Sequence, residues 1–155
     1  FETGKISPEE FHEAACELFG MKIGFGKFRE IWNDIFKENM ALTRWLREMS
    51  ASHRVYIISN TNALHYAHLL EKFDFFRWVN GTVASNEAGM RKPDPRIFYK
   101  ALQTAGVRPA QAFYLDDVWE HVYSARRCGM RAYHYVCPHM AQESWKHFLS
   151  RPSGW

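Results

Sequence analysis

Cysteine is scarce in this chain of 155 residues, and the cysteines present do not suit a structural role. Cys16, Cys128 and Cys137 are widely spaced and odd in number, and they form no C-x-x-C pair. The spacing therefore gives no basis for a disulfide framework or a zinc ribbon. Such cysteine usage is typical of a reducing compartment, so we predict a cytoplasmic protein.

Long apolar runs and blocks of charge are also missing. No stretch reaches the roughly 18 apolar residues that a membrane-spanning helix needs, and the first residues do not have the basic and apolar regions of a signal peptide. The net charge is +3, and lysine and arginine are scattered among the acidic residues. We therefore predict neither a nucleic acid nor a membrane as a partner. The hydrophobic share of 46% is that of an ordinary globular domain.

The first third of the chain has the pattern of helices. Ser7 precedes a proline and is followed three residues later by a glutamate, which predicts a capping box, and Gly20 predicts the end of that helix. Apolar residues at helical spacing predict two further helices, over residues 27–37 and 40–49. The stretch GFG at residues 24–26 follows no strand and lacks a third glycine, so we predict no nucleotide-binding loop there.

After residue 50 short apolar strands alternate with helices of about ten residues. This alternation predicts βαβ units and a mostly parallel sheet with helices on both faces, a Rossmann-like α/β fold of three layers. The predicted strands cover residues 55–58, 78–84, 112–115 and 131–136, and the predicted helices cover residues 63–72, 95–105, 118–128 and 139–148.

Polar side chains follow three of the predicted strands. In an open parallel sheet, ligands bind beyond the carboxyl ends of the strands, because loops and helix N-termini converge there. These side chains are therefore the candidate site. They are Ser59, Asn60 and Thr61 after the first strand, Lys92 after the second, and Asp116 and Asp117 after the third.

Each group has a chemical use in this position. A serine at a strand-to-helix turn, with free N–H groups behind it, suits the oxygens of a phosphoryl group. Lys92, next to Pro93 and close to Pro95, supplies a cation for the same oxygens. Adjacent carboxylates at Asp116 and Asp117 suit Mg²⁺, a hard cation that prefers oxygen ligands.

Structural interpretations of the same residues remain open. Ser59 and Asn60 could cap the next helix, Lys92 could be a solvated loop lysine, and the aspartate pair could cap the helix that follows it. Residues 134–139 contain two histidines and a cysteine, but strand alternation followed by an exposed turn explains them more simply than a metal site does.

Three stretches together resemble a known family. VYIISNTNALH, SNEAGMRKPDPRIF and FYLDDVWEHVYSARRCGM, in this order and spacing, resemble the second, third and fourth motifs of the haloacid dehalogenase superfamily. Within it, the chain resembles the phosphatase branch that carries a small helical cap. The resemblance covers nearly the whole chain, from Phe1 to Tyr135.

The resemblance implies a role for each candidate residue. Ser59 would bind a phosphoryl oxygen, and Asn60–Thr61 would add donors beside it. Lys92 would steady both the nucleophile and the phosphoryl group. Asp116 and Asp117 would help to hold Mg²⁺.

The chain departs from the pattern of the family in three places. It contains no D-x-D, the family's first motif, whose first aspartate attacks phosphorus. The central strand and the start of the cap are missing with it, so we predict a partial helical cap over residues 1–38 and an α/β core without its first strand over residues 39–155. His121 stands where close relatives usually have asparagine. The chain starts at Phe1 without methionine, and we expect part of its natural beginning to be missing.

The resemblance implies a Mg²⁺-dependent phosphatase that acts on a small phosphorylated metabolite through an aspartyl-phosphate, with its nucleophile in the missing segment. We expect the chain alone to be inactive, and an oligomer is expected if another chain completes the sheet. The alternatives are a non-catalytic phosphate-binding protein of the same fold and a haloacid dehalogenase. A phosphoacceptor receiver domain gathers similar side chains, but its acid pair comes first in the chain, whereas here the hydroxyl comes first.

Overall fold

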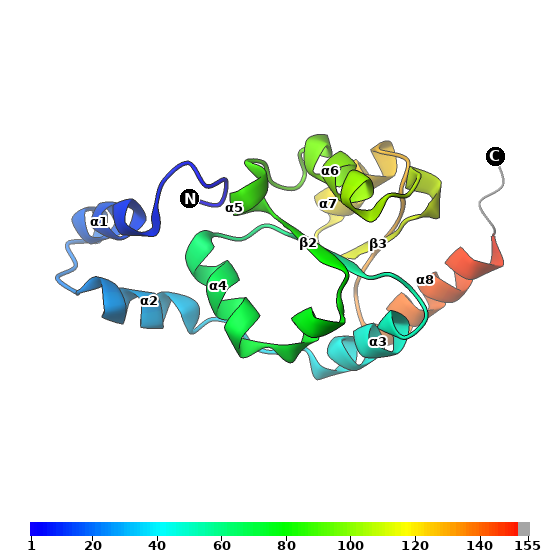
Figure 1. The fold of residues 1–155 in the computed structure, drawn as a ribbon, viewed down its shortest axis with the longest axis horizontal. Coiled ribbons are helices and arrows are strands. Elements are labelled where there is room, and N and C mark those ends of the chain that lie inside the picture. The colour runs from blue at the N-terminus through cyan, green and yellow to red at the C-terminus, as the bar shows by residue number, and fades with distance from the viewer. Residues whose placement is uncertain (152–155) are drawn as a thin grey trace. The chain divides into compact units, whose positions relative to one another are not determined.

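A computed structural model describes residues 1–151 of the chain (Figure 1). By its internal contacts the chain divides into two units, residues 1–91 and residues 92–155. Each unit contains a pair of parallel strands, and the strands are β1 (Tyr56–Ser59) with β2 (Gly81–Ala84) in the first unit, and β3 (Phe113–Asp116) with β4 (Arg131–His134) in the second.

Helix α1 (Pro8–Phe19) begins at the capping box that the sequence predicts. The Ser7 hydroxyl accepts a hydrogen bond from the Glu10 N–H at 3.1 Å, and a Glu10 carboxylate oxygen accepts one from the Ser7 N–H at 2.7 Å. The helix ends at Gly20, whose φ of +63° lies in the left-handed region that glycine adopts without strain. Both predicted ends of this helix are confirmed.

Helices α2 (Phe25–Asn33) and α3 (Met40–Ser50) follow. Helix α2 begins two residues before the predicted helix over 27–37 and ends four residues before its predicted end. Ile31 is 56% exposed, so the apolar residues behind the longer prediction are not all on a buried face. Helix α3 extends one residue beyond its predicted range.

The remaining elements of the first unit surround the β1–β2 pair. Helix α4 (Ala63–Lys72) has the predicted bounds. Strand β2 is shorter than the predicted strand over 78–84, because Asp74–Trp78 forms a 3-10 helix, η1. A single helical turn, α5 (Ser85–Ala88), follows β2 and is absent from the prediction.

An aromatic core joins α1, α2 and α4 in the first unit. Ala15, Phe28 and Leu64 are buried in it, and the rings of Phe11 and Trp32 pack against them. Phe11 meets Trp32 edge to face, with ring centroids 4.8 Å apart. The residues that the sequence assigns to a cap therefore share a core with α4. The predicted domain boundary between residues 38 and 39 lies inside this unit and stays a prediction.

In the second unit, Asp116 of β3 lies opposite His134 of β4. Ile97, Phe98 and Val122 are completely buried between the helices and this strand pair. The helices of the unit are α6 (Pro95–Ala105), the 3-10 helix η2 (Pro109–Gln111), α7 (Trp119–Arg127) and α8 (Pro138–Ser150).

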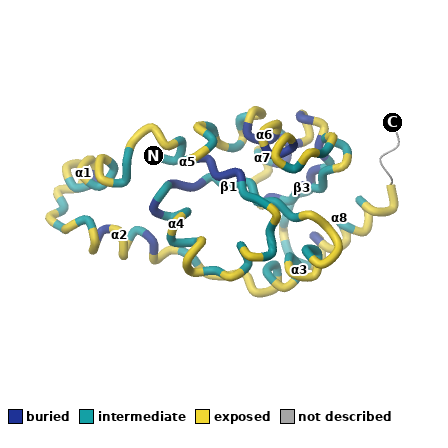
Figure 2. Tube along the Cα trace, viewed as in Figure 1, coloured by how far each residue is buried: buried dark blue, intermediate teal, exposed yellow. Residues whose placement is uncertain are grey.

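The parallel pairing of the described strands, with helices between them in the chain, confirms the predicted α/β class. Buried residues are concentrated along β2 and the start of α4 in the first unit, and along α6 and α7 in the second (Figure 2). Over residues 1–151, no helix combines the length and the hydropathy that a membrane span requires.

Candidate functional site

The loop Ser59–Asn62 joins the carboxyl end of β1 to the start of α4, and its last two residues are buried. Asn62 caps α4, because its Oδ1 accepts a hydrogen bond from the His65 N–H at 3.0 Å. Neither Ser59 nor Asn60 is therefore the cap, which removes the structural interpretation of these two residues. Their donors lie at a strand end before a helix N-terminus, a position that favours anionic oxygens.

Ser85, the residue after β2, holds this loop from the neighbouring strand. Its side chain is fully buried, and its Oγ accepts a hydrogen bond from the Thr61 N–H at 2.9 Å and donates one to the Thr61 carbonyl at 2.8 Å. The parallel register places Ser59 opposite Ala84, so Ser85 follows β2 at the level of the loop. The sequence places Ser85 directly after a predicted strand, but it does not by itself give this residue a role.

Lys92 and Asp116 form an ion pair in the second unit. The Lys92 Nζ lies 2.7 Å from Asp116 Oδ2, and the two side chains are only 11% and 5% exposed. A lysine in this setting is not a solvated loop residue. The structure thus brings together two of the predicted site residues that are 24 positions apart in the chain.

The Asp116 carboxylate accepts hydrogen bonds on both oxygens. Oδ2 accepts from Lys92 and from the Tyr114 hydroxyl. Oδ1 accepts from the Val118 N–H at 2.9 Å and lies 3.0 Å from His121 Nδ1. The N-cap of α7 is Val118, so Asp116 does not serve as the cap residue of that helix.

These contacts decide the charge of Asp116. Burial alone would raise the pKa of its carboxyl group, but the hydrogen bonds from Lys92 and Tyr114 outweigh burial and lower that pKa. The pKa of Tyr114 is raised by burial and by its hydrogen bond to the carboxylate, so the phenol keeps its proton. Asp116 is therefore an anion held by a cation and a neutral hydroxyl.

Asp117 differs from its neighbour because it is exposed. Its backbone carbonyl accepts a hydrogen bond from His134 Nε2 at 2.8 Å, which fixes the main chain at the end of β3. A carboxylate oxygen here is the kind of ligand that Mg²⁺ prefers. Among the described residues, however, no three His, Cys, Asp or Glu side chains gather into a metal site. The donors suit Mg²⁺ in kind but are few.

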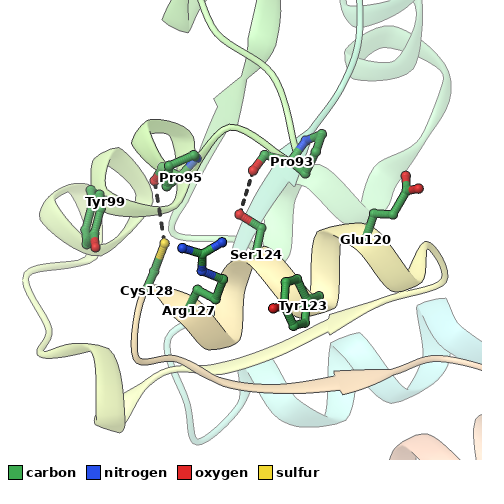
Figure 3. Close-up of a pocket in the computed structure, with 8 residues that line it drawn as sticks. All are labelled: Pro93, Pro95, Tyr99, Glu120, Tyr123, Ser124, Arg127 and Cys128. Atoms are coloured by element: carbon green, nitrogen blue, oxygen red, sulfur yellow. Dashed lines mark hydrogen bonds between the residues drawn. The ribbon is translucent and has the colours of Figure 1, made fainter.

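A groove of about 520 Å³ lies between α6 and α7, and neither Lys92 nor the aspartate pair is among its lining residues (Figure 3). Tyr99 and Tyr123 lie along it with more than half of each side chain exposed. Ser124 Oγ donates to the Pro93 carbonyl at 2.5 Å, which ties α7 to the segment that follows Lys92. The groove therefore lies beside the segment that follows Lys92.

Comparison with known proteins agrees with these features. A family model of haloacid dehalogenase-like hydrolases matches residues 25–129, which include every candidate residue of both units. The chain belongs to this family. The sequence analysis predicted membership of the haloacid dehalogenase superfamily, and the family model confirms that prediction.

Relatives of the chain are named as phosphatases. The sesquiterpene phosphatase astK of Aspergillus oryzae is 30% identical over 138 residues, which cover 86% of this chain and 69% of that protein. The D-ribitol-5-phosphate phosphatase of Bacteroides thetaiotaomicron is 23% identical over 139 residues, covering 85% of this chain and 68% of that protein.

A solved structure supports the fold. A haloacid dehalogenase family enzyme of Bacteroides thetaiotaomicron, crystallised with magnesium and inorganic phosphate, is 27% identical to this chain with a TM-score of 0.81. The match covers 97% of this chain and 77% of that enzyme. The predicted fold class, a haloacid dehalogenase-like α/β fold, is confirmed by this likeness together with the family model.

Proposed function

We propose that this chain carries part of the active site of a Mg²⁺-dependent phosphatase, which hydrolyses a small phosphorylated metabolite through an aspartyl-phosphate. The observation that carries the proposal is the buried ion pair of Lys92 and Asp116 beside the exposed Asp117. A cation fixed at a strand end stabilises the negative charge that develops on a transferring phosphoryl group. The phosphatase names of the relatives support this reaction class.

The residues of the chain have separate tasks in this proposal. The Ser59 hydroxyl and donors of Asn60 bind phosphoryl oxygens. The Thr61 hydroxyl joins them by releasing the Asn62 carbonyl, which lies 3.4 Å away. Ser85 holds the loop in place through the N–H and the carbonyl of Thr61. Lys92 serves as a cation for phosphoryl oxygens, and Asp116 keeps it in position.

The metal would be held mainly by Asp117. Asp116 would have to exchange one of its present donors to become a direct ligand, since both of its oxygens are engaged. When bound, Mg²⁺ supplies positive charge to the phosphate oxygens. Because Asp117 is the one carboxylate of the pair that is open to solvent, we expect this chain to bind Mg²⁺ weakly.

The nucleophile is proposed to come from a segment outside these 155 residues, which contain no D-x-D. Attack on phosphorus needs a carboxylate in line with the leaving group. Asp116 does not meet this need, because Lys92, Tyr114 and two further groups already hold its oxygens. We therefore propose that the chain alone is inactive, and that a strand from another segment or another chain completes the sheet. A cytoplasmic location stays a prediction from cysteine usage.

A complementation assay tests the proposal. The 155-residue chain is mixed with Mg²⁺ and a panel of phosphate esters, alone and with a synthetic segment that carries an apolar strand ending in D-x-D. We expect turnover only with the segment, and no turnover when its first aspartate is replaced by asparagine. Lys92-dependent turnover by the chain alone would show that the nucleophile lies within it.

Two other outcomes separate the alternatives. Binding of inorganic phosphate without turnover under any condition would favour a non-catalytic phosphate-binding protein. Release of halide from a 2-haloacid, with no hydrolysis of phosphate esters, would favour a dehalogenase.

A further inference from the structure

His65 lies in the first turn of α4 and contacts two segments of the first unit through its ring nitrogens. Nε2 lies 3.0 Å from the backbone carbonyl oxygen of Trp32, at the end of α2. Nδ1 lies 3.0 Å from Nδ2 of Asn62, the last residue of the loop after β1. The imidazole therefore stands between helix α2 and the loop Ser59–Asn62.

The partners of the ring fix its tautomer. A carbonyl oxygen accepts hydrogen bonds and does not donate them, so Nε2 must carry the proton. The Asn62 Oδ1 accepts from the His65 N–H at 3.0 Å, which leaves the Asn62 amide nitrogen facing Nδ1. The amide donates, so Nδ1 accepts and the ring is neutral.

The surroundings of the ring support the neutral form. The His65 ring stacks on the Trp32 indole, with centroids 5.4 Å apart and planes at 16°, and Phe36 meets it edge to face at 4.8 Å. Burial by these rings lowers the pKa of His65. At neutral pH the ring therefore accepts and donates at the same time, as its two contacts require.

We propose that His65 is a positioning residue, which ties the loop Ser59–Asn62, through the Asn62 side chain, to the end of helix α2. The loop is then held on two sides, by Ser85 at Thr61 and by His65 at Asn62. The inference rests on the proposed function, because the loop is the one assigned to phosphate binding. Two hydrogen bonds, Trp32 to His65 and His65 to Asn62, thus connect the end of α2 to the residue that follows Thr61.

Two substitutions each remove one of the two hydrogen bonds of the His65 ring and keep the other. In His65→Gln the side-chain amide nitrogen can still donate to the Trp32 carbonyl, but no acceptor faces Asn62. In His65→Asn the shorter amide can face Asn62, but it does not reach Trp32. His68→Gln is the matched control, because His68 lies one turn later on α4 and its buried Nε2 has no hydrogen-bond partner among the described residues.

Amide hydrogen exchange of the full 155-residue chain measures the coupling. The informative amides are those of Thr61, His65 and Tyr66, which donate to Ser85, to the Asn62 side chain and to the Asn62 carbonyl. We expect His65→Gln to accelerate their exchange roughly two- to tenfold, the size of one lost hydrogen bond. His65→Asn should accelerate them less, and His68→Gln should leave them unchanged. In the wild-type protein, long-range proton–nitrogen NMR should show the Nε2–H tautomer.

Several results would overturn the inference. Equal exchange in the three variants would show that His65 does not position the loop. Acceleration spread evenly over α1, α2 and α4 would show a purely structural role, and an Nδ1–H tautomer would contradict the assigned contacts.

Titration with inorganic phosphate separates this inference from the proposed function. In the wild-type chain, phosphate should shift the amide signals of Ser59, Asn60 and Thr61, and His65→Gln should weaken that response at least twofold at a temperature where both proteins are folded. If phosphate shifts none of these signals in the wild type, the proposed function fails, and the exchange rates still decide whether His65 holds the loop. If phosphate binds equally well to both proteins, the positioning role fails.

Discussion

Tyr114→Phe removes the hydroxyl group that donates a hydrogen bond to Asp116, the carboxylate that holds Lys92. The substitution changes little else. The Tyr114 ring packs edge to face on Phe98 with centroids 5.4 Å apart, and phenylalanine keeps that contact. A hydrogen bond to a charged group contributes about 1.5–3 kcal/mol. Because this hydrogen bond favours the charged form of Asp116, its loss should raise the pKa of that carboxyl group and lower the stability of the fold at neutral pH.

The sign of the pH effect follows from the lowered pKa of Asp116. A carboxyl group with a lowered pKa stabilises the fold fully above its unfolded value of 3.8, and this contribution is lost as the pH falls through the folded value. Tyr114→Phe should therefore be less stable than the wild type at pH 7, and the difference in stability between the two proteins should shrink as the pH falls below the unfolded pKa of the carboxyl group.

Carbon-13 NMR of the Asp116 carboxyl group and urea unfolding between pH 3 and pH 7 measure both effects. Tyr123→Phe is the control, because Tyr123 is 57% exposed on α7 of the same unit. An unchanged pKa of Asp116 in Tyr114→Phe would refute the view that the hydroxyl helps to keep this carboxylate ionised.

Three further substitutions have defined outcomes. In the complemented enzyme, Lys92→Ala should lower kcat about 100-fold, or ~3 kcal/mol, because it removes a fixed cation from the transition state; unchanged kcat for an aryl phosphate would contradict the role. Asp117→Asn should weaken Mg²⁺ binding measured by calorimetry, and equal affinity would place the metal elsewhere. Ser85→Ala leaves the N–H and carbonyl of Thr61 without their buried partner and should lower the free energy of unfolding in urea by about 1–3 kcal/mol, with Ser50→Ala as the exposed control.

Local signals explain which elements the sequence predicts well. The capping box of Ser7 and Glu10 lies within four consecutive residues, and the structure forms it as expected. The end of α2 depends instead on contacts from elsewhere in the chain. Phe36, predicted to be helical, lies beyond Asn33, and its ring meets His65 from α4. A pattern read along the chain does not contain that contact.

The same contrast between local signals and distant contacts applies to the residues of the candidate site. The strand-end rule and the motifs found Ser59, Lys92 and the aspartate pair, because position after a strand is visible in the sequence. The role of Ser85 was not predicted, because its partner Thr61 is 24 residues away. Tyr114 was within reach, since residues two apart on a strand point to the same face, and its hydroxyl meets Asp116.

The difference between the two aspartates assigns them different tasks. Asp116 is buried and its oxygens are already satisfied, so a metal ion at Asp116 would have to displace Lys92, Tyr114, Val118 or His121. Loss of a partner from a buried charge is costly, whereas Asp117 is exposed to solvent. The donors around Asp116 therefore favour a carboxylate that fixes the lysine. Asp116 is thus suited to hold Lys92, and Asp117 is suited to bind a metal ion. The two adjacent aspartates differ in these tasks because one is buried and the other is exposed.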